Sequence, residues 1–170
     1  MTIKRYTLAV LVHNQFGVLN RVTSMFRRRQ FNIDNLTVSE TESPDYSRIT
    51  VQFAGERVTK QQLVDQLYKL PDVCSIRELD SDNSVSFELL LIKLKNDPAS
   101  RGDIRAAADA FEAKTVDYTR DSIVLRVTAD SRRIDDFIDL MRDYEILEIC
   151  RTGVVSLERG ADTIRKVTNL

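Results

Sequence analysis

The chain has 170 residues, of which 42% are hydrophobic and 30% are charged, and its formal net charge is −1. This composition is typical of a packed globular protein with one full-sized domain or two small ones, and it excludes a strongly basic chain that coats nucleic acid or an anionic membrane. No apolar stretch approaches the roughly 20 residues that cross a bilayer, and no signal peptide follows Met1, so we expect a cytoplasmic protein without a membrane partner.

Charge is distributed unevenly along the chain. Residues 1–79 carry a net charge of +3 and residues 80–170 a net charge of −4. The polar residues 80–84 lie at this change, and a polar stretch of this kind is typical of a domain boundary. The sequence therefore predicts two domains, residues 1–79 and residues 80–170.

A change of hydrophobic period predicts the first strand and the first helix. Residues 6–12 alternate in the manner of a β-strand, and the turn-forming residues 14–17 end it. Apolar residues then recur at helical spacing, which predicts a helix with one buried face. These residues are Val18, Leu19, Val22, Met25 and Phe26.

Two strands, a helix and a final strand are predicted in the rest of the first half. Residues 33–41 and 47–53 are strand candidates around a turn at residues 43–45, and residues 73–79 form the last strand. Residues 59–62 have the form of a capping box at the start of a helix. The order β-α-β-β-α-β folds, with right-handed crossovers, into a four-stranded sheet with both helices on one face.

The second half of the chain repeats this order. Its expected strands are residues 85–95, 114–118, 122–128 and 145–157. One helix follows Pro98, and Asp130 or Ser131 can cap the other. We therefore expect an α+β fold of two tandem ferredoxin-like βαββαβ domains, with a loose tail from Gly160 on.

Residues that enzymes use for catalysis are sparse. His13 is the only histidine, and beside a turn such a side chain is more often solvated or hydrogen-bonded than catalytic. The five glycines are isolated, so the chain has no glycine-rich phosphate loop, and no Cys, His and carboxylate cluster has the spacing of metal ligands. Cys74 and Cys150 lie among apolar residues, and we expect both to be buried, reduced thiols. The sequence therefore argues against an active site in this chain.

The same order of elements occurs in RNA-binding modules, which stack bases on aromatic side chains of the third strand. Residues 47–53 form that strand here, and they contain no glycine and a single aromatic residue, Phe53. The stacking platform is absent, so we expect no nucleic acid partner.

The junction of the first strand and the first helix is the best candidate for a binding site. The amide of Asn14 can donate and accept hydrogen bonds, and Gly17 lacks a Cβ, so a ligand can approach its backbone. The N–H groups of Gly17, Val18 and Leu19 open the helix, where free donors and the helix dipole favour a carboxylate. A free amino acid would offer this carboxylate, and an ammonium group to the Asn14 carbonyl oxygen. Alternatively, Asn14 and Gly17 serve only the turn.

This junction resembles that of a known family. The stretch from Val12 to Val22 is similar to the opening of the ACT domain in small subunits of acetolactate (acetohydroxyacid) synthase. Further similar stretches follow in order along nearly the whole chain. They are residues 28–38, 47–51, 66–70, 111–114, 148–154 and 157–160.

The resemblance implies a regulatory function. Members of that family are non-catalytic subunits that bind a catalytic (large) subunit, raise its activity and confer feedback inhibition by valine or another branched-chain amino acid. The reaction is the first common step of branched-chain amino acid biosynthesis. The resemblance implies no cofactor in this chain, because thiamine diphosphate, magnesium and FAD would belong to the catalytic subunit.

The resemblance also implies a homodimer, in which the ACT domains of two chains pair side by side and the effector lies between them. The effector-binding residues carried over from the family motif are Asn14, Gly17, Val18 and Leu19 of one chain and Asn32 and Ile33 of its partner. The chain departs from the family at Gln30, where a glycine is common and would suit a left-handed C-cap of the first helix.

Two alternatives remain open at this point. A free-standing ACT-type amino-acid sensor would regulate a different target, and an enzyme can also be built on a ferredoxin-like fold. Binding of amino acids separates a sensor from a protein that senses nothing. Reconstitution with a catalytic subunit separates the regulatory subunit from the free-standing sensor.

Overall fold

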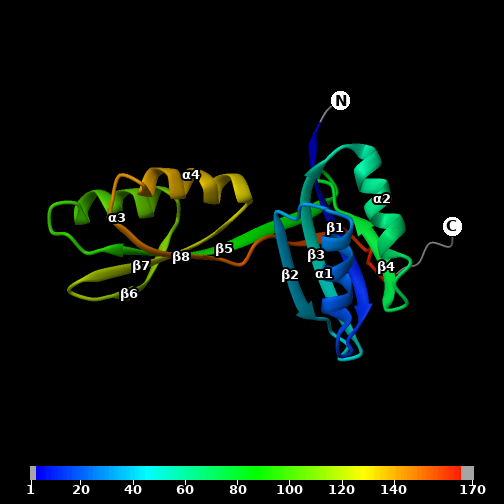
Figure 1. The fold of residues 1–170 in the computed structure, drawn as a ribbon. Coiled ribbons are helices and arrows are strands. Elements are labelled where there is room, and N and C mark those ends of the chain that lie inside the picture. The colour runs from blue at the N-terminus through cyan, green and yellow to red at the C-terminus, as the bar shows by residue number, and fades with distance from the viewer. Residues whose placement is uncertain (1–2, 166–170) are drawn as a thin grey trace. The chain divides into compact units, whose positions relative to one another are not determined.

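A computed structural model describes residues 3–165 of the chain (Figure 1). It divides into two units: the N-terminal unit contains the residues up to 86 and those from 155 on, and the C-terminal unit contains residues 87–154. The division falls after Ser86, whereas the sequence suggested residue 79, because one long strand, β5 (Ser84–Lys95), contributes to both units. Near the start of this strand Ser86 bonds to Ser156, their hydroxyl oxygens being 2.7 Å apart, which attaches the returning chain to the N-terminal unit.

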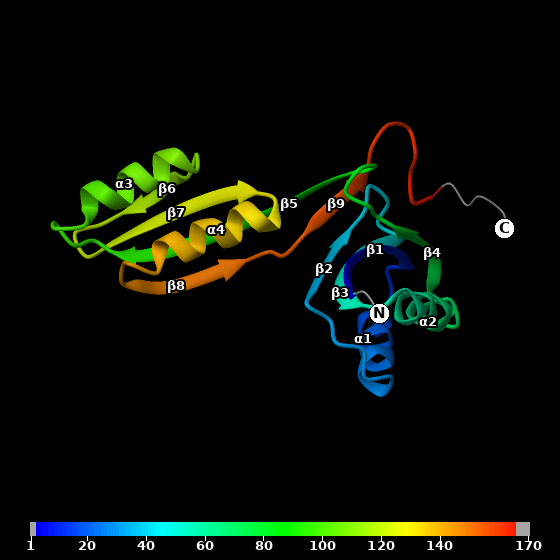
Figure 2. The ribbon, with the colours of Figure 1, turned by 90° about the horizontal axis from the view of Figure 1, so that it is seen from above.

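The N-terminal unit has one antiparallel sheet and two helices. Its elements are β1 (Lys4–His13), α1 (Val18–Arg28), β2 (Asn35–Glu40), β3 (Tyr46–Gly55), α2 (Arg57–Leu67) and β4 (Val73–Glu78). The strand order is β2-β3-β1-β4, and both helices lie on one side of the sheet (Figure 2). Leu8, Val10 and Val12 of β1 face these helices and form the centre of the core. The predicted order and topology are confirmed.

The C-terminal unit repeats this architecture. Its elements are β5, α3 (Arg101–Ala110), β6 (Lys114–Tyr118), β7 (Ser122–Ala129), α4 (Ser131–Met141) and β8 (Ile146–Arg151). The strand order is β6-β7-β5-β8, and α3 and α4 cover one face of the sheet (Figure 1). Leu90, Ile92 and Leu94 of β5 pack against both helices, so alternate residues of this strand supply the core. The predicted α+β class with two ferredoxin-like sheets is confirmed.

The starts of α1 and α4 agree with prediction, whereas the start of α2 differs. Asp130 caps α4, since its carboxylate accepts the backbone N–H of Arg133 at 2.9 Å. The capping box predicted at residues 59–62 is wrong, because α2 already begins at Arg57 and Thr59 lies inside its first turn.

The tail predicted from Gly160 on is wrong for residues 160–165. After β9 (Val155–Glu158), which pairs with β5, the chain crosses the side of the N-terminal sheet that carries no helices (Figure 2). The Ile164 side chain is only 8% exposed and packs against Ala9 and Leu11 of β1. Apolar residues on both faces of β1 explain this cover, which alternation alone did not predict. Residues 166–170 lie outside the described part of the chain.

The two cysteines differ in their surroundings. Cys74 is half-buried and packs against the cluster that contains Leu11 and Ile164. Cys150 is exposed, and the prediction that it is buried is wrong. It lies opposite Leu91 in the register of β5 and β8, on the face of the C-terminal sheet that has no helices.

Candidate functional site

The junction of β1 and α1 is held to the β2–β3 hairpin by Asn14. The Asn14 Nδ2 group donates to the carbonyl oxygen of Pro44 at 2.9 Å and to the Glu40 carboxylate at 3.3 Å. The Asn14 Oδ1 atom accepts the Ser47 hydroxyl at 3.0 Å. An amide oxygen has two lone pairs, so Asn14 serves the turn and still has one acceptor position for a ligand.

The start of α1 has free hydrogen-bond donors. Gly17 is the N-cap and adopts φ +81°, a left-handed conformation that favours glycine. No side chain caps the helix, and no acidic residue lies in its first turn. Among the described residues, the N–H groups of Gly17, Leu19 and Asn20 have no backbone acceptor. Free N–H groups and the positive end of the helix dipole together favour a bound carboxylate.

Arg21 adds positive charge to this corner, and sequence reasoning had not identified it as part of the site. A Cβ placed on Gly17 would lie 3.2 Å from its Nη1 atom. Its Nε atom donates to the Asp72 carboxylate at 2.7 Å, an ion pair that joins α1 to the start of β4. Arg21 lies one helical turn after Gly17, and this spacing could have identified it from the sequence. Its ion pair with Asp72, which lies 51 positions away, could not be predicted in this way.

An open surface depression runs along the first turn of α1. It is lined by Asn14, Gln15, Phe16, Gly17, Leu19, Asn20 and Thr23. The Phe16 ring is fully exposed and Leu19 is 43% exposed, so the depression presents apolar surface to solvent. Val18 is buried in the core, and its N–H donates to the Gln15 carbonyl at 3.3 Å, so the prediction that this N–H is free for a ligand is wrong. A small ligand in this depression needs a second surface to cover it.

Asn32 and Ile33 lie at the opposite end of α1. Asn32 is exposed, and Ile33 packs against the core of the N-terminal unit. The 11 residues of α1 between the two groups span roughly 16 Å at the usual rise per residue. A single chain therefore does not bring these two residues together with Asn14 and Gly17.

Gln30 takes the backbone conformation expected of a glycine. Its φ is +56°, its N–H donates to the carbonyl of Arg27, and the Phe31 N–H donates to the carbonyl of Phe26. These are the two hydrogen bonds of a Schellman motif, which satisfies carbonyl groups at the helix end. The departure from glycine thus leaves the left-handed C-cap in place.

Three further observations concern the surroundings of His13, clusters of metal-binding side chains and helices that could span a membrane. The His13 ring stacks on the Tyr46 ring with their centroids 5.3 Å apart. Within residues 3–165 there is no group of three or more His, Cys, Asp and Glu side chains that could hold a metal ion. No helix in the same range is long and apolar enough to cross a membrane.

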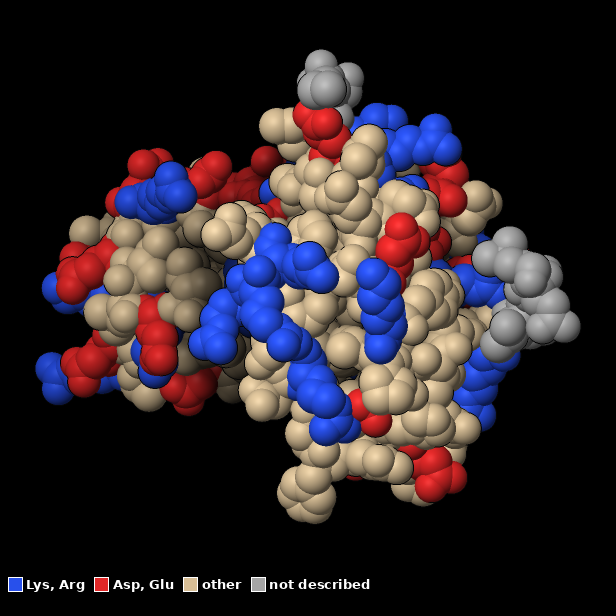
Figure 3. All heavy atoms as spheres, turned by 45° about the vertical axis from the view of Figure 1, so that its right-hand side comes forward, with Lys and Arg blue, Asp and Glu red and all other residues tan. Residues whose placement is uncertain are grey.

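Arginines are concentrated at the end of α1. Arg27, Arg28 and Arg29 are all exposed, and cations at a helix C-terminus are favoured by the dipole. Figure 3 shows a band of Lys and Arg side chains on one face of the molecule, with acidic groups on the same face. Arg29 also donates to the Gln66 side chain at 3.2 Å, so part of this charge is used to join α1 to α2.

Two family models match this chain, one in each half. The model described as "AHAS small subunit-like ACT domain" matches residues 8–75. The model described as "Small subunit of acetolactate synthase" matches residues 87–160.

Known proteins similar to this chain cover most of its length. A probable acetolactate synthase small subunit of Archaeoglobus fulgidus is 44% identical over 92% of this chain and 98% of its own. The acetolactate synthase small subunit of Bacillus subtilis is 41% identical over 90% of each chain. The crystal structure of the small subunit from Thermotoga maritima superposes with a TM-score of 0.87 at 32% identity, covering 94% of this chain and 99% of its own.

Proposed function

The chain belongs to the family of acetolactate synthase small subunits, and on that basis we propose that it activates the catalytic subunit and confers feedback inhibition by a branched-chain amino acid. Small subunits of this family are the regulatory subunits of the holoenzyme. The partner is the large subunit, which carries thiamine diphosphate, magnesium and FAD. The effector is valine or a related branched-chain amino acid.

The observation that carries the proposal is the uncapped start of α1. Its free N–H groups and the nearby Arg21 guanidinium suit the effector carboxylate, and the Asn14 Oδ1 atom suits the ammonium group. Leu19 and Phe16 offer apolar surface for a branched side chain. The site thus matches the three chemical parts of a small apolar amino acid.

A homodimer would complete this open site. β2 is an edge strand of its sheet, and Asn14 lies beside its last residue, since it bonds to Glu40. Asn32 and Ile33 lie three and two residues before its first residue, Asn35. Antiparallel pairing of β2 with the same strand of a second chain sets the start of one strand beside the end of the other. The Asn32 and Ile33 of one chain would then face the Asn14 and Gly17 of its partner.

Reconstitution tests this function. The purified chain is added to its cognate catalytic subunit, and acetolactate formation is measured with and without valine, leucine and isoleucine. We expect a higher rate in the presence of the chain and inhibition by at least one of the three amino acids. No gain in rate would overturn the proposed activation. Binding of amino acids without any effect on the enzyme would favour a free-standing sensor.

Two glycine variants test the site. Gly17→Asp places a carboxylate at the start of α1, and we expect loss of inhibition with activation retained, because like charges repel. Gly102→Asp places the same carboxylate in the first turn of α3, where a Cβ has open space, and serves as the control. Unchanged inhibition in Gly17→Asp would overturn the assignment of the site.

A further inference from the structure

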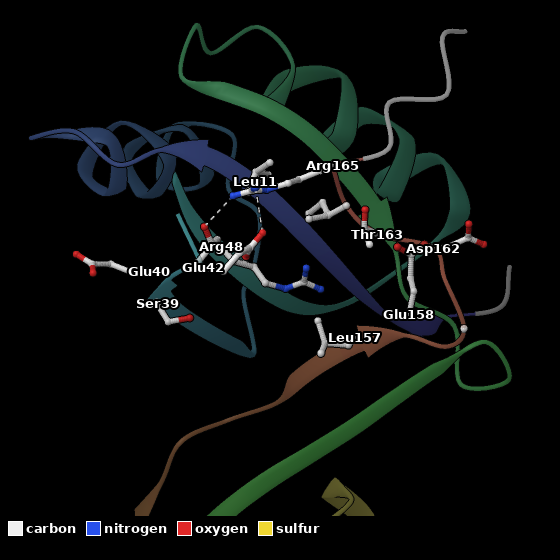
Figure 4. Close-up of a pocket in the computed structure, with 13 residues that line it drawn as sticks. Leu11, Ser39, Glu40, Glu42, Arg48, Leu157, Glu158, Asp162, Thr163 and Arg165 are labelled. Atoms are coloured by element: carbon white, nitrogen blue, oxygen red, sulfur yellow. Dashed lines mark hydrogen bonds and ion pairs between the residues drawn. The ribbon is translucent and has the colours of Figure 1, made fainter. Parts of the chain in front are cut away.

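A second cavity lies on the helix-free side of the N-terminal sheet, under residues 157–165 (Figure 4). Its volume is about 460 Å³, which is within the usual range for small-molecule sites. One wall is formed by β1, β2 and β3, and the other by β9 and the chain after it. This cavity shares none of its lining residues with the depression at the start of α1.

Two arginines line this cavity, and of these Arg165 is paired with Glu42, whereas Arg48 is not. Arg48 stands opposite Leu11 in the register of β1 and β3, and its side chain reaches from β3 toward Leu157 (Figure 4). Its Nη2 group donates to the carbonyl oxygen of Ser156 at 2.7 Å. Burial lowers the pKa of Arg48, and the carboxylates of Glu158 and Glu42 offset this only in part. Among the described residues the guanidinium has no ion pair, so donors remain for an anion.

Glu158 provides a negative charge on the opposite wall, and Glu40, Glu42 and Asp162 also line the cavity. The Glu158 side chain is half-buried and, within the described chain, forms no ion pair with Arg48 or another cation. Glu42 differs, because its carboxylate pairs with Arg165 at 3.1 Å. Arg48 and Glu158 are therefore two opposite charges that face one cavity without forming an ion pair with each other. Apolar side chains complete the lining. They are Leu11, Leu157 and Ile164.

We propose that this cavity binds a small zwitterion, an α-amino acid with an apolar side chain. The carboxylate pairs with Arg48, the ammonium group with Glu158, and the side chain packs on Leu11, Leu157 and Ile164. A simple carboxylate would leave Glu158 unmatched beside it, and a simple amine would leave Arg48 unmatched. A ligand with both charges pairs with Arg48 and Glu158 at the same time.

An occupant of this cavity would join the C-terminal segment to the sheet. Existing attachments of this segment include the Arg165–Glu42 ion pair and the hydrogen bond from the Ser75 hydroxyl to the Ile164 carbonyl. A ligand held between Arg48 and Glu158 adds a further bridge, so binding should order residues 158–165. The site is distinct from the proposed effector site and does not depend on dimer formation.

Titration followed by NMR tests this inference. The ¹⁵N-labelled full chain is titrated with L-valine, L-leucine and L-isoleucine, and with isovalerate and isobutylamine as the two halves of the zwitterion. We expect saturable shifts of the Gly160, Thr163 and Ile164 amides with at least one amino acid and not with either half. Arg48→Gln should weaken this binding about tenfold or more, because a charge-assisted bond to the carboxylate is lost.

Three further variants make the result specific. Arg126→Gln removes an arginine from the helix-free side of β7 in the C-terminal unit and should leave the titration unchanged. Glu158→Gln should weaken binding through the ammonium group, and it keeps the inference testable if Arg48→Gln fails to fold. Gly17→Asp should retain the shifts of residues 160–164, which separates this site from the proposed effector site. Absence of amino-acid shifts in this segment, or shifts that persist in both Arg48→Gln and Glu158→Gln, would overturn the inference.

Discussion

The two units share one topology but differ where their first strand meets their first helix. Asn14 follows β1 and Asn96 follows β5, and the backbone N–H of each donates to the β-hairpin beside it, to Asp45 at 2.8 Å and to Asp121 at 3.0 Å. The Asn96 side chain also donates to the hairpin, to the carbonyl of Thr119 at 2.6 Å. The same asparagine therefore holds the same corner in both units.

The surroundings of this corner explain why only one of them is a candidate site. The Asn96 carbonyl oxygen accepts the Arg101 Nε group at 2.7 Å, and the Arg101 guanidinium lies over the Tyr118 ring. Asp97 accepts the Ala99 N–H, and an acidic residue lies in the first turn of α3. The C-terminal unit thus fills its own corner with charge, whereas α1 leaves donors free. A binding site arises here from what the scaffold leaves unsatisfied.

The largest expected effect concerns the buried carboxylate of the C-terminal unit. Glu88 is 3% exposed, and its carboxylate accepts two N–H donors of the Arg151 guanidinium, from Nη2 at 2.6 Å and from Nε at 3.0 Å. Arg151→Ala leaves that charge unpaired and should reduce the free energy of unfolding by about 3 kcal/mol. Urea unfolding measures the loss. Arg142→Ala removes an exposed ion pair and should change it by less than about 0.5 kcal/mol; equal losses would contradict the comparison.

The second prediction compares alanine variants of the two asparagines. Asn14→Ala should weaken effector binding about tenfold or more, because an acceptor for the ammonium group is removed. Asn96→Ala removes an equivalent amide from a corner already filled by Arg101, so effector binding should be unchanged. Calorimetry with valine measures both variants. Equal effector affinities of the two variants would show that the corners do not differ in function.

The third prediction compares the reactivity of the two cysteine thiols, which lie on the helix-free faces of the two sheets. Burial, and then the charge of Asp72, raise the pKa of the Cys74 thiol, so at pH 8 its reactive thiolate fraction is reduced. Cys150 is exposed, and we expect iodoacetamide to modify it about tenfold faster, as measured by mass spectrometry. Raising the pH toward the raised pKa should narrow the difference. Ile164→Ala removes part of the side chain that packs in the same cluster as Cys74. It should therefore accelerate the modification of Cys74 and leave the modification of Cys150 unchanged.

Periodicity predicted the order of strands and helices in both units, because most of these elements bury one face locally. β6 is an exception, since all of its residues are exposed, and the strand expected at residues 145–157 is two strands, β8 and β9. Periodicity could not predict the cover of the N-terminal sheet, since Ile164 is a single apolar residue in a polar segment and its partners lie more than 80 positions away. The boundary between the two units at Ser86 could not be predicted either, because the alternation of buried and exposed residues continues through β5. The residues of the candidate site came from a motif, whereas Arg21 required its long-range partner, Asp72, to be known.

The smallest predicted effect tests a feature that the two units share. Gln30 and Glu112 end α1 and α3 with φ of +56° and +55°, and both close Schellman motifs. A side chain in the left-handed region costs roughly 1–2 kcal/mol, and glycine loses roughly 0.5–1 kcal/mol through its unfolded-state entropy. Gln30→Gly and Glu112→Gly should therefore each raise the free energy of unfolding by about 0.5–1 kcal/mol.

Urea unfolding of the two single variants and the double variant measures these gains. The gains should be additive, because the two positions lie in separate cores. Gln30→Ala and Glu112→Ala keep a Cβ at the same φ, so they serve as controls and should give no gain. A glycine gain at only one position would mean that the other side chain makes a compensating contact, and the two helix ends would then join the corners as a place where the units differ.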